Sequence, residues 1–108
     1  MKTSVLERFL RYVRIDTRSD DSSTSCPSTP GQLALMRLLE RELRDIGLSD
    51  VVVDGNGYLM ATVPATVSRD VPVIGFIAHV DTSPEMSGAN VTPIVHEKYD
   101  GRDIVLPD

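Results

Sequence analysis

A histidine and an aspartate stand two positions apart at the end of an apolar stretch of this chain. They are His79 and Asp81, within residues 73–84, whose sequence is VIGFIAHVDTSP. While a backbone stays extended, side chains two residues apart point to the same side. A carboxylate beside an imidazole can accept the Nδ1–H, which fixes the tautomer and leaves Nε2 for a metal ion or a proton. The pair therefore makes His79 a candidate for metal binding or proton transfer.

The residues before this pair predict a buried strand. Residues 73–78 are apolar, rich in β-branched side chains and uncharged, which is typical of a strand covered on both faces. In open α/β sheets, ligands bind in the crevice at the carboxyl ends of the strands. From these residues alone, a hydrogen-bonded structural histidine is the more common interpretation of His79, and a metal ligand is the alternative.

Two helices are predicted ahead of this strand. Apolar residues at helical spacing predict an amphipathic helix over residues 4–14, capped by Thr3 or Ser4. Thr29 followed by proline predicts the start of a second helix over residues 30–46. The glycine that follows residue 46 supplies its stop.

Further strands and a loop complete the expected order. Asn-Gly between two β-forming runs predicts a hairpin of strands 51–54 and 58–63. Residues 92–97 and 104–106 predict two more strands, and the polar residues 16–30 predict a loop to which we assign no chemistry. Helices followed by strands predict an α/β fold in which helices cover a mixed sheet.

The composition narrows the function classes. The chain has 108 residues and a net charge of −5, so nucleic-acid binding has no electrostatic support. No apolar run reaches the roughly 20 residues of a membrane span, and the N-terminus lacks a signal-peptide core. The single cysteine, Cys26, cannot form an internal disulfide. Together these features predict a cytoplasmic protein with no membrane or nucleic-acid partner.

Three segments carry a family resemblance when they are taken in order. They are PSTPGQ at residues 27–32, GNGYLMAT at 55–62 and GFIAHVDTSP at 75–84. The set resembles the peptidase T family of tripeptide aminopeptidases, within the co-catalytic zinc peptidases and deacylases. An isolated His-x-Asp occurs by chance in many proteins, whereas the ordered set of three is specific and covers essentially the whole chain.

The resemblance implies a zinc-dependent aminopeptidase that releases the N-terminal residue from tripeptides. It implies that His79 ligates one of two zinc ions of the full-length site and that Asp81 is a catalytic residue that orients His79. In the family, the zinc ions polarise the scissile carbonyl and a shared water, and a glutamate moves that water's proton. The resemblance places that glutamate and the other ligands downstream of the matched segments.

Members of this family are several times longer than 108 residues. We therefore expect residues 1–108 to be the truncated N-terminal portion of the catalytic domain, inactive alone, with the remaining part of that domain as partner and a short peptide as substrate. A non-catalytic remnant and a related zinc deacylase or desuccinylase stay open. We expect His96 to be an exposed or edge-strand histidine rather than a ligand. Thr82 and Ser83 could suggest a nucleophile, but no second histidine with an aspartate partner supports such a system.

Overall fold

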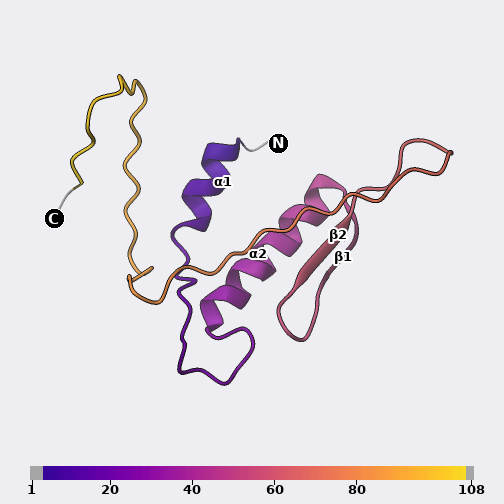
Figure 1. The fold of residues 1–108 in the computed structure, drawn as a ribbon, viewed down its shortest axis with the longest axis horizontal. Helices are drawn as coiled ribbons and strands as arrows, with labels where there is room; N and C mark the ends of the chain where they lie inside the picture. The colour runs from indigo at the N-terminus through magenta and orange to yellow at the C-terminus, as the bar shows by residue number, and fades with distance from the viewer. Residues whose placement is uncertain (1–3, 107–108) are drawn as a thin grey trace.

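A computed structural model describes residues 4–106 of the chain. Two helices come first, α1 over Val5–Tyr12 and α2 over Pro30–Ile46. Two strands follow, β1 over Ser49–Val53 and β2 over Leu59–Thr62. The strands form an antiparallel hairpin beside α2, and the chain continues after β2 as a long irregular segment (Figure 1).

α1 begins with one of the two predicted caps. The Ser4 hydroxyl accepts a hydrogen bond from the backbone N–H of Glu7, and the Glu7 carboxylate accepts one from the N–H of Ser4. This reciprocal capping box satisfies two of the N–H groups that every helix start leaves without partners. The same bonds from Ser4 lower the pKa of Glu7. The start of α1 is therefore encoded within four residues.

α2 has the predicted start and stop. Thr29 is its N-cap residue and Pro30 occupies the first turn, where a missing N–H leaves no bond unmade. Gly47 ends the helix with a φ of 96°, a left-handed conformation that glycine adopts without a Cβ penalty. The N–H of Gly47 then returns to the last turn and donates to the carbonyl of Arg44.

The predicted hairpin is confirmed close to its expected bounds. At its turn, Oδ1 of Asp54 accepts hydrogen bonds from the N–H groups of Asn56, at 2.9 Å, and Tyr58, at 2.8 Å. Gly57 adopts a φ of 84° beside the ring of Pro27, and a Cβ there would lie 3.0 Å from Cδ of that ring. The turn therefore requires glycine for both its conformation and its space.

α2 is the centre of the packed part of the chain. It packs against both strands of the hairpin. Among residues 4–106, the buried apolar side chains are Leu35 of α2 and Val51 of β1. α1 is attached to α2 through Glu42, whose carboxylate bonds to the Arg11 guanidinium and to the Tyr12 hydroxyl. The described core is thus small, with one buried apolar side chain on α2 and one on β1.

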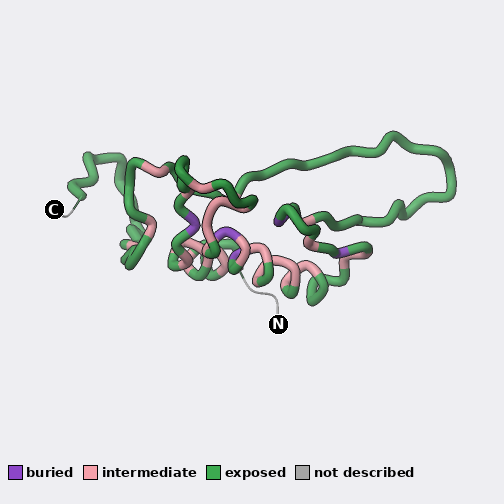
Figure 2. Tube along the Cα trace, turned by 90° about the horizontal axis from the view of Figure 1, so that it is seen from below, coloured by how far each residue is buried: buried purple, intermediate pink, exposed green. Residues whose placement is uncertain are grey.

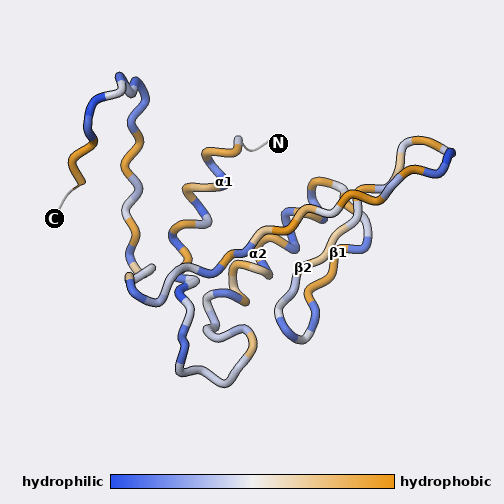
Figure 3. The backbone as a smooth tube through the Cα atoms, in the orientation of Figure 1, coloured by the Kyte–Doolittle hydropathy of each residue, from blue (hydrophilic) through white to orange (hydrophobic). Residues whose placement is uncertain are grey.

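The strand predicted over residues 73–78 is not formed. Its side chains are almost fully exposed, with Val73 at 98% and Ile77 at 101%. Figure 1 shows this segment crossing α2 and the hairpin, whereas the turned view of Figure 2 shows it lying apart from them. In Figure 3 it is one of the long hydrophobic runs of the chain. An extended segment becomes a strand only when a neighbour takes its backbone hydrogen bonds, and no described residue pairs with 73–78.

The strands predicted over 92–97 and 104–106 are also absent from the structure. The predicted mixed sheet is therefore wrong for residues 4–106, which contain a two-stranded antiparallel sheet and two helices. This arrangement is compatible with part of an α/β domain. The radius of gyration is 17.3 Å, whereas a closed domain of this length has about 13 Å. His96 is exposed, as expected, but not on a strand.

Candidate functional site

The candidate chemistry of the chain lies at residues 79–81. Nδ1 of His79 is 3.1 Å from Oδ1 of Asp81 and 3.0 Å from its backbone carbonyl oxygen. The two side chains therefore meet as their spacing predicts. The His79 side chain is 85% exposed. With the hydrogen on Nδ1, the lone pair of Nε2 is offered to solvent.

Ser19 adds a third group to this pair. Its hydroxyl donates a hydrogen bond to Oδ2 of Asp81 at 2.9 Å, so that both carboxylate oxygens of Asp81 have a partner. The bond from Ser19 and, next, the one from His79 hold the pKa of Asp81 below its ordinary value. Asp81 is thus charged at neutral pH, which is the form that accepts the Nδ1–H of an imidazole most strongly.

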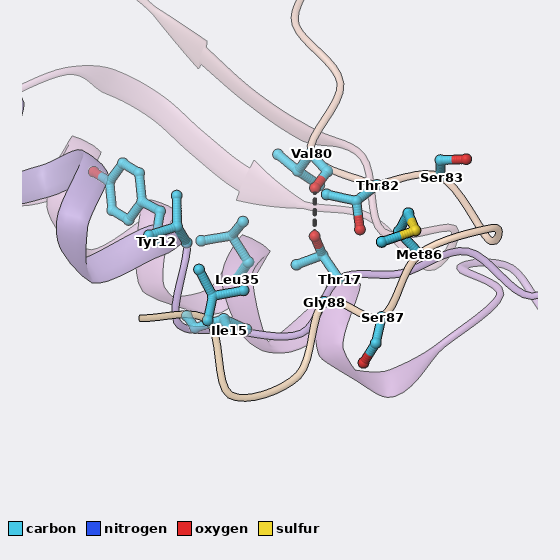
Figure 4. Close-up of a pocket in the computed structure, with 12 residues that line it drawn as sticks. Tyr12, Ile15, Thr17, Leu35, Val80, Thr82, Ser83, Met86, Ser87 and Gly88 are labelled. Carbon is cyan, nitrogen blue, oxygen red and sulfur yellow. Dashed lines mark hydrogen bonds between the residues drawn. The ribbon is translucent and has the colours of Figure 1, made fainter. Parts of the chain in front are cut away.

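The polar loop before α2 holds the segment that carries Asp81. The N–H of Ser19 donates to the carbonyl of Thr82 at 2.9 Å, and the N–H of Thr82 donates to the carbonyl of Thr17 at 3.2 Å. These bonds form a short parallel bridge. The buried Thr17 hydroxyl also donates to the carbonyl of Val80 at 2.8 Å (Figure 4). The loop, to which the sequence assigned no chemistry, is therefore the support of the site.

Gln32, in the first turn of α2, holds this loop from the inside. Its side-chain N–H₂ donates toward the carbonyl of Thr17 and the hydroxyl of Ser19, each at 3.3 Å. The carbonyl oxygens of Thr17 and Arg18 can only accept, so the N–H₂ end of the amide faces the loop. Oε1 faces the backbone N–H of Thr29, at 3.5 Å. Gln32 is only 6% exposed, and buried amides need such partners.

Two glycines allow the backbone to approach Asp16 closely. A Cβ on Gly31 would lie 1.7 Å from the carbonyl oxygen of Asp16, because the loop crosses over the first turn of α2. A Cβ on Gly88 would lie 2.6 Å from Oδ1 of the same residue. The first contact gives a structural reason for the glycine in the Pro-Ser-Thr-Pro-Gly-Gln segment.

An open apolar hollow of about 460 Å³ lies on the other side of the docked segment. Figure 4 shows its lining, which includes Ile15, Leu35, Val80 and Met86. Side chains alternate along an extended backbone, and neither His79 nor Asp81 lines the hollow. The hollow is therefore an apolar surface behind the site rather than the place of its chemistry.

The residues present fit one position of a zinc site. A neutral imidazole with its Nδ1–H paired is a normal zinc ligand. A catalytic zinc takes about three protein ligands, and residues 4–106 contain no group of three or more side chains that could hold a metal ion. His79 can thus contribute a ligand but cannot hold a catalytic zinc alone.

Curated proteins named peptidase T match this chain over all or nearly all of its length. The relative from Bacillus velezensis is 55% identical over 108 residues, which are 100% of this chain and 26% of the relative. The relatives from Geobacillus thermodenitrificans and Bacillus subtilis are 57% and 55% identical over 106 residues, which are 98% of this chain and 26% of each relative. No protein-family model matches the chain.

This chain is homologous to part of peptidase T. The family resemblance carried by the three sequence segments is thereby confirmed. The chain spans about a quarter of the length of the peptidase T relatives that it matches. Among residues 4–106, no helix is long and apolar enough to cross a membrane.

The sequence predicted the contact between His79 and Asp81, but it did not predict the support from Thr17, Ser19 and Gln32. One signal was available for the last of these. A threonine followed three positions later by glutamine is a capping-box pattern, and it predicts that the Gln32 amide turns back toward Thr29. Nothing local marks Ser19, whose partner Asp81 is 62 positions away in the sequence.

Proposed function

We propose that this chain is the part of a zinc-dependent aminopeptidase that carries His79, and that the enzyme releases the N-terminal residue from tripeptides. The observation that supports the proposal is the pair of His79 and Asp81, docked on the loop before α2. It occurs in a chain that is homologous to peptidase T over its whole length. An oriented imidazole with an exposed Nε2 is what a zinc ligand requires.

In this proposal Nε2 of His79 binds one of two zinc ions. Zinc, when bound, polarises the scissile carbonyl and lowers the pKa of a water molecule. Asp81 keeps the Nδ1–H of His79 paired and the ring oriented. In the reaction, water adds to the peptide carbonyl, the C–N bond breaks, and the leaving amine gains a proton. The group that moves this proton and the other metal ligands come from outside this chain.

The proposal requires the remaining part of the catalytic domain as partner. Residues 73–78 offer apolar side chains on both faces and a backbone that no described residue pairs with. Such a segment fits the interior of a sheet that other strands complete. The unpaired Cys26 thiol is exposed, and an exposed free thiol is typical of the reducing cytoplasm, where we place the enzyme.

A hybrid enzyme tests this function. The segment of the Bacillus velezensis relative that matches this chain is replaced by the 108 residues of this chain, and the zinc content and the hydrolysis of a tripeptide are measured. We expect two zinc ions per hybrid chain and release of the N-terminal residue. His79→Ala removes a ligand outright, so it should lower zinc content and reduce kcat/KM by more than the roughly 100-fold that loss of a ligand's partner can cost.

His96→Ala is the matched control, because it removes the other histidine of the chain and should leave both readouts unchanged. A His79→Ala hybrid that keeps two zinc ions and full activity would refute the role of His79. A folded hybrid that binds zinc but cleaves only N-acylated amino acids would indicate a deacylase. A folded hybrid without any activity would favour a non-catalytic remnant.

A further inference from the structure

We propose that Ser19 is a positioning residue of this site, which holds the Asp81 carboxylate against Nδ1 of His79. The inference rests on the proposed function for its catalytic meaning. Two contacts support it. The Ser19 hydroxyl lies 2.9 Å from Oδ2 of Asp81, and Nδ1 of His79 lies 3.1 Å from Oδ1. One carboxylate thus joins a serine from the loop before α2 to the candidate metal ligand.

The direction of the hydrogen bonds is set from the helix outward. Gln32 donates through Nε2 toward the Ser19 oxygen at 3.3 Å. The oxygen of Ser19 therefore acts as acceptor on its buried side, and its single hydrogen is left for the carboxylate, which can only accept. Oδ1 of Asp81 remains for the Nδ1–H of His79. Gln32 of α2 therefore donates to Ser19, and Ser19 donates to Oδ2 of Asp81. The other oxygen of Asp81 accepts the hydrogen from His79.

This series of hydrogen bonds matters because few other contacts hold His79 and Asp81 in place. The side chains of His79 and Asp81 are 85% and 49% exposed, and residues 73–78 leading to them have no strand partner among residues 4–106. An exposed carboxylate has several rotamers. The bond from Ser19 selects the rotamer that faces His79. The carboxylate contact then adds to that of the Asp81 backbone carbonyl, 3.0 Å from Nδ1, in favouring the hydrogen on Nδ1.

The side chain of Ser19 can be removed without undocking the loop. The bridge between the loop and residue 82 uses backbone groups, including the Ser19 N–H, and Ser19→Ala leaves these intact. Ser19→Thr keeps the hydroxyl and is the conservative variant. Ser28→Ala is the matched control, because Ser28 also accepts from Nε2 of Gln32, at 3.1 Å, and contacts neither site residue.

The first measurement is the tautomer of His79, read from imidazole ¹⁵N chemical shifts of the 108-residue chain at a concentration where sedimentation shows a monomer. The pH is set about two units above the ordinary histidine pKa of about 6.5. The chain has two histidines, so the exposed His96 gives the reference for an unconstrained ring. We expect the unsubstituted chain to hold its hydrogen on Nδ1 of His79. Ser19→Ala should move both His79 shifts toward those of His96, while Ser19→Thr and Ser28→Ala should leave them unchanged.

The second measurement is the zinc dissociation constant of the hybrid enzyme defined above. Loss of an outer partner of a metal ligand costs about 10–100-fold, and Ser19 acts one group further out. We therefore expect Ser19→Ala to weaken zinc binding by about tenfold, the low end of that range, with recovery in Ser19→Thr. Zinc affinity reports on the ligand itself, so a general effect on turnover alone would not produce this pattern.

The outcomes separate this inference from the proposed function. His79 shifts that are the same in Ser19→Ala as in the unsubstituted chain would overturn the positioning role. Ser28→Ala producing the same change as Ser19→Ala would also overturn it, because the effect would then belong to the loop as a whole. If the shifts depend on Ser19 but the hybrid binds no zinc through His79, the positioning role stands and the proposed function fails.

Discussion

At the scale of single residues, the site is a series of hydrogen bonds that connects Gln32, Ser19 and Asp81 to the imidazole of His79. Asp81 contacts His79 through one carboxylate oxygen and Ser19 through the other. Its charge is what makes it a stronger acceptor than an amide would be. The residue-scale expectation is therefore that charge at position 81, rather than side-chain size, matters for the site.

Asp81→Asn in the hybrid enzyme tests that expectation. Asparagine keeps the size of the side chain and an acceptor oxygen, but it removes the charge that favours a paired imidazole. We expect zinc affinity or kcat/KM to fall by about 10–100-fold. Asp70→Asn, at an exposed position of the chain, is the control and should have no effect. Unchanged kinetics of Asp81→Asn at every zinc concentration would mean that Asp81 is only a loop residue.

At the scale of elements, α2 does two things that its sequence pattern does not show together. It packs on the hairpin, and its first turn supports the loop that docks residues 80–82. The loop crosses this turn so closely that no side chain fits at Gly31. α1, in contrast, is defined by its own cap and by its attachment to Glu42.

Gly31→Ala should destabilise the docking of the loop. In an isolated helix this change would add about 1 kcal/mol of stability. Here the new Cβ would meet the carbonyl of Asp16, and overpacking of this kind typically costs about 1–3 kcal/mol. Amide exchange of Ser19 and Thr82, measured by NMR, should become faster. Gly55→Ala is the control, because a Cβ there meets nothing within 4 Å. Equal or slower exchange in Gly31→Ala would contradict the close crossing.

The capping box of α1 should be sensitive to acid. Bonds from Ser4 lower the pKa of Glu7 from its ordinary 4.5, so the folded helix favours the charged carboxylate. The stabilisation is complete above pH 4.5 and is lost as pH falls through the lower pKa of the folded state. We expect backbone NMR shifts of α1 to lose helical character over that window. Glu7→Gln should remove the pH dependence, and an unchanged transition in that variant would assign it to another group.

At the scale of the whole molecule, the chain is an open arrangement rather than a closed domain. Apolar side chains of residues 73–78 face solvent, including Phe76 at 96% exposure. The extended shape in Figures 1 and 2 and the radius of gyration of 17.3 Å agree with this. Exposed apolar surface and unpaired strand edges promote association. The same features make residues 73–78 suited to pairing with the rest of a larger sheet.

Residues 1–108 alone should therefore self-associate and should not hydrolyse a tripeptide, even with excess zinc. One histidine cannot hold catalytic zinc, which needs about three protein ligands. Ile77→Lys should shift the chain toward monomer in sedimentation experiments, because it places a charge on the exposed apolar run. Val5→Lys, at another exposed position, is the control. Release of an N-terminal residue that depends on zinc and on His79 would contradict the expected inactivity.

The sequence by itself determined the elements whose signals are local. The caps at Ser4 and Gly47, the Thr29-Pro30 start and the Asn-Gly turn lie within a few residues of the backbone groups that they satisfy, so they can be read without tertiary information. The contact of His79 with Asp81 is equally local, because alternation along an extended backbone places them on one side.

Only the tertiary structure decided whether residues 73–78 are a strand and what supports Asp81. A strand depends on hydrogen bonds to a neighbouring chain segment. The apolar pattern of residues 73–78 favours burial, but it does not identify a segment that would pair with them. Ser19 lies 62 positions from Asp81. Their contact exists because Gly31 lets the loop cross α2 and Gln32 then holds it there. A contact between residues so far apart leaves no periodic pattern in the sequence. The sequence therefore predicted the contact of His79 with Asp81, and the fold determined which residues support it.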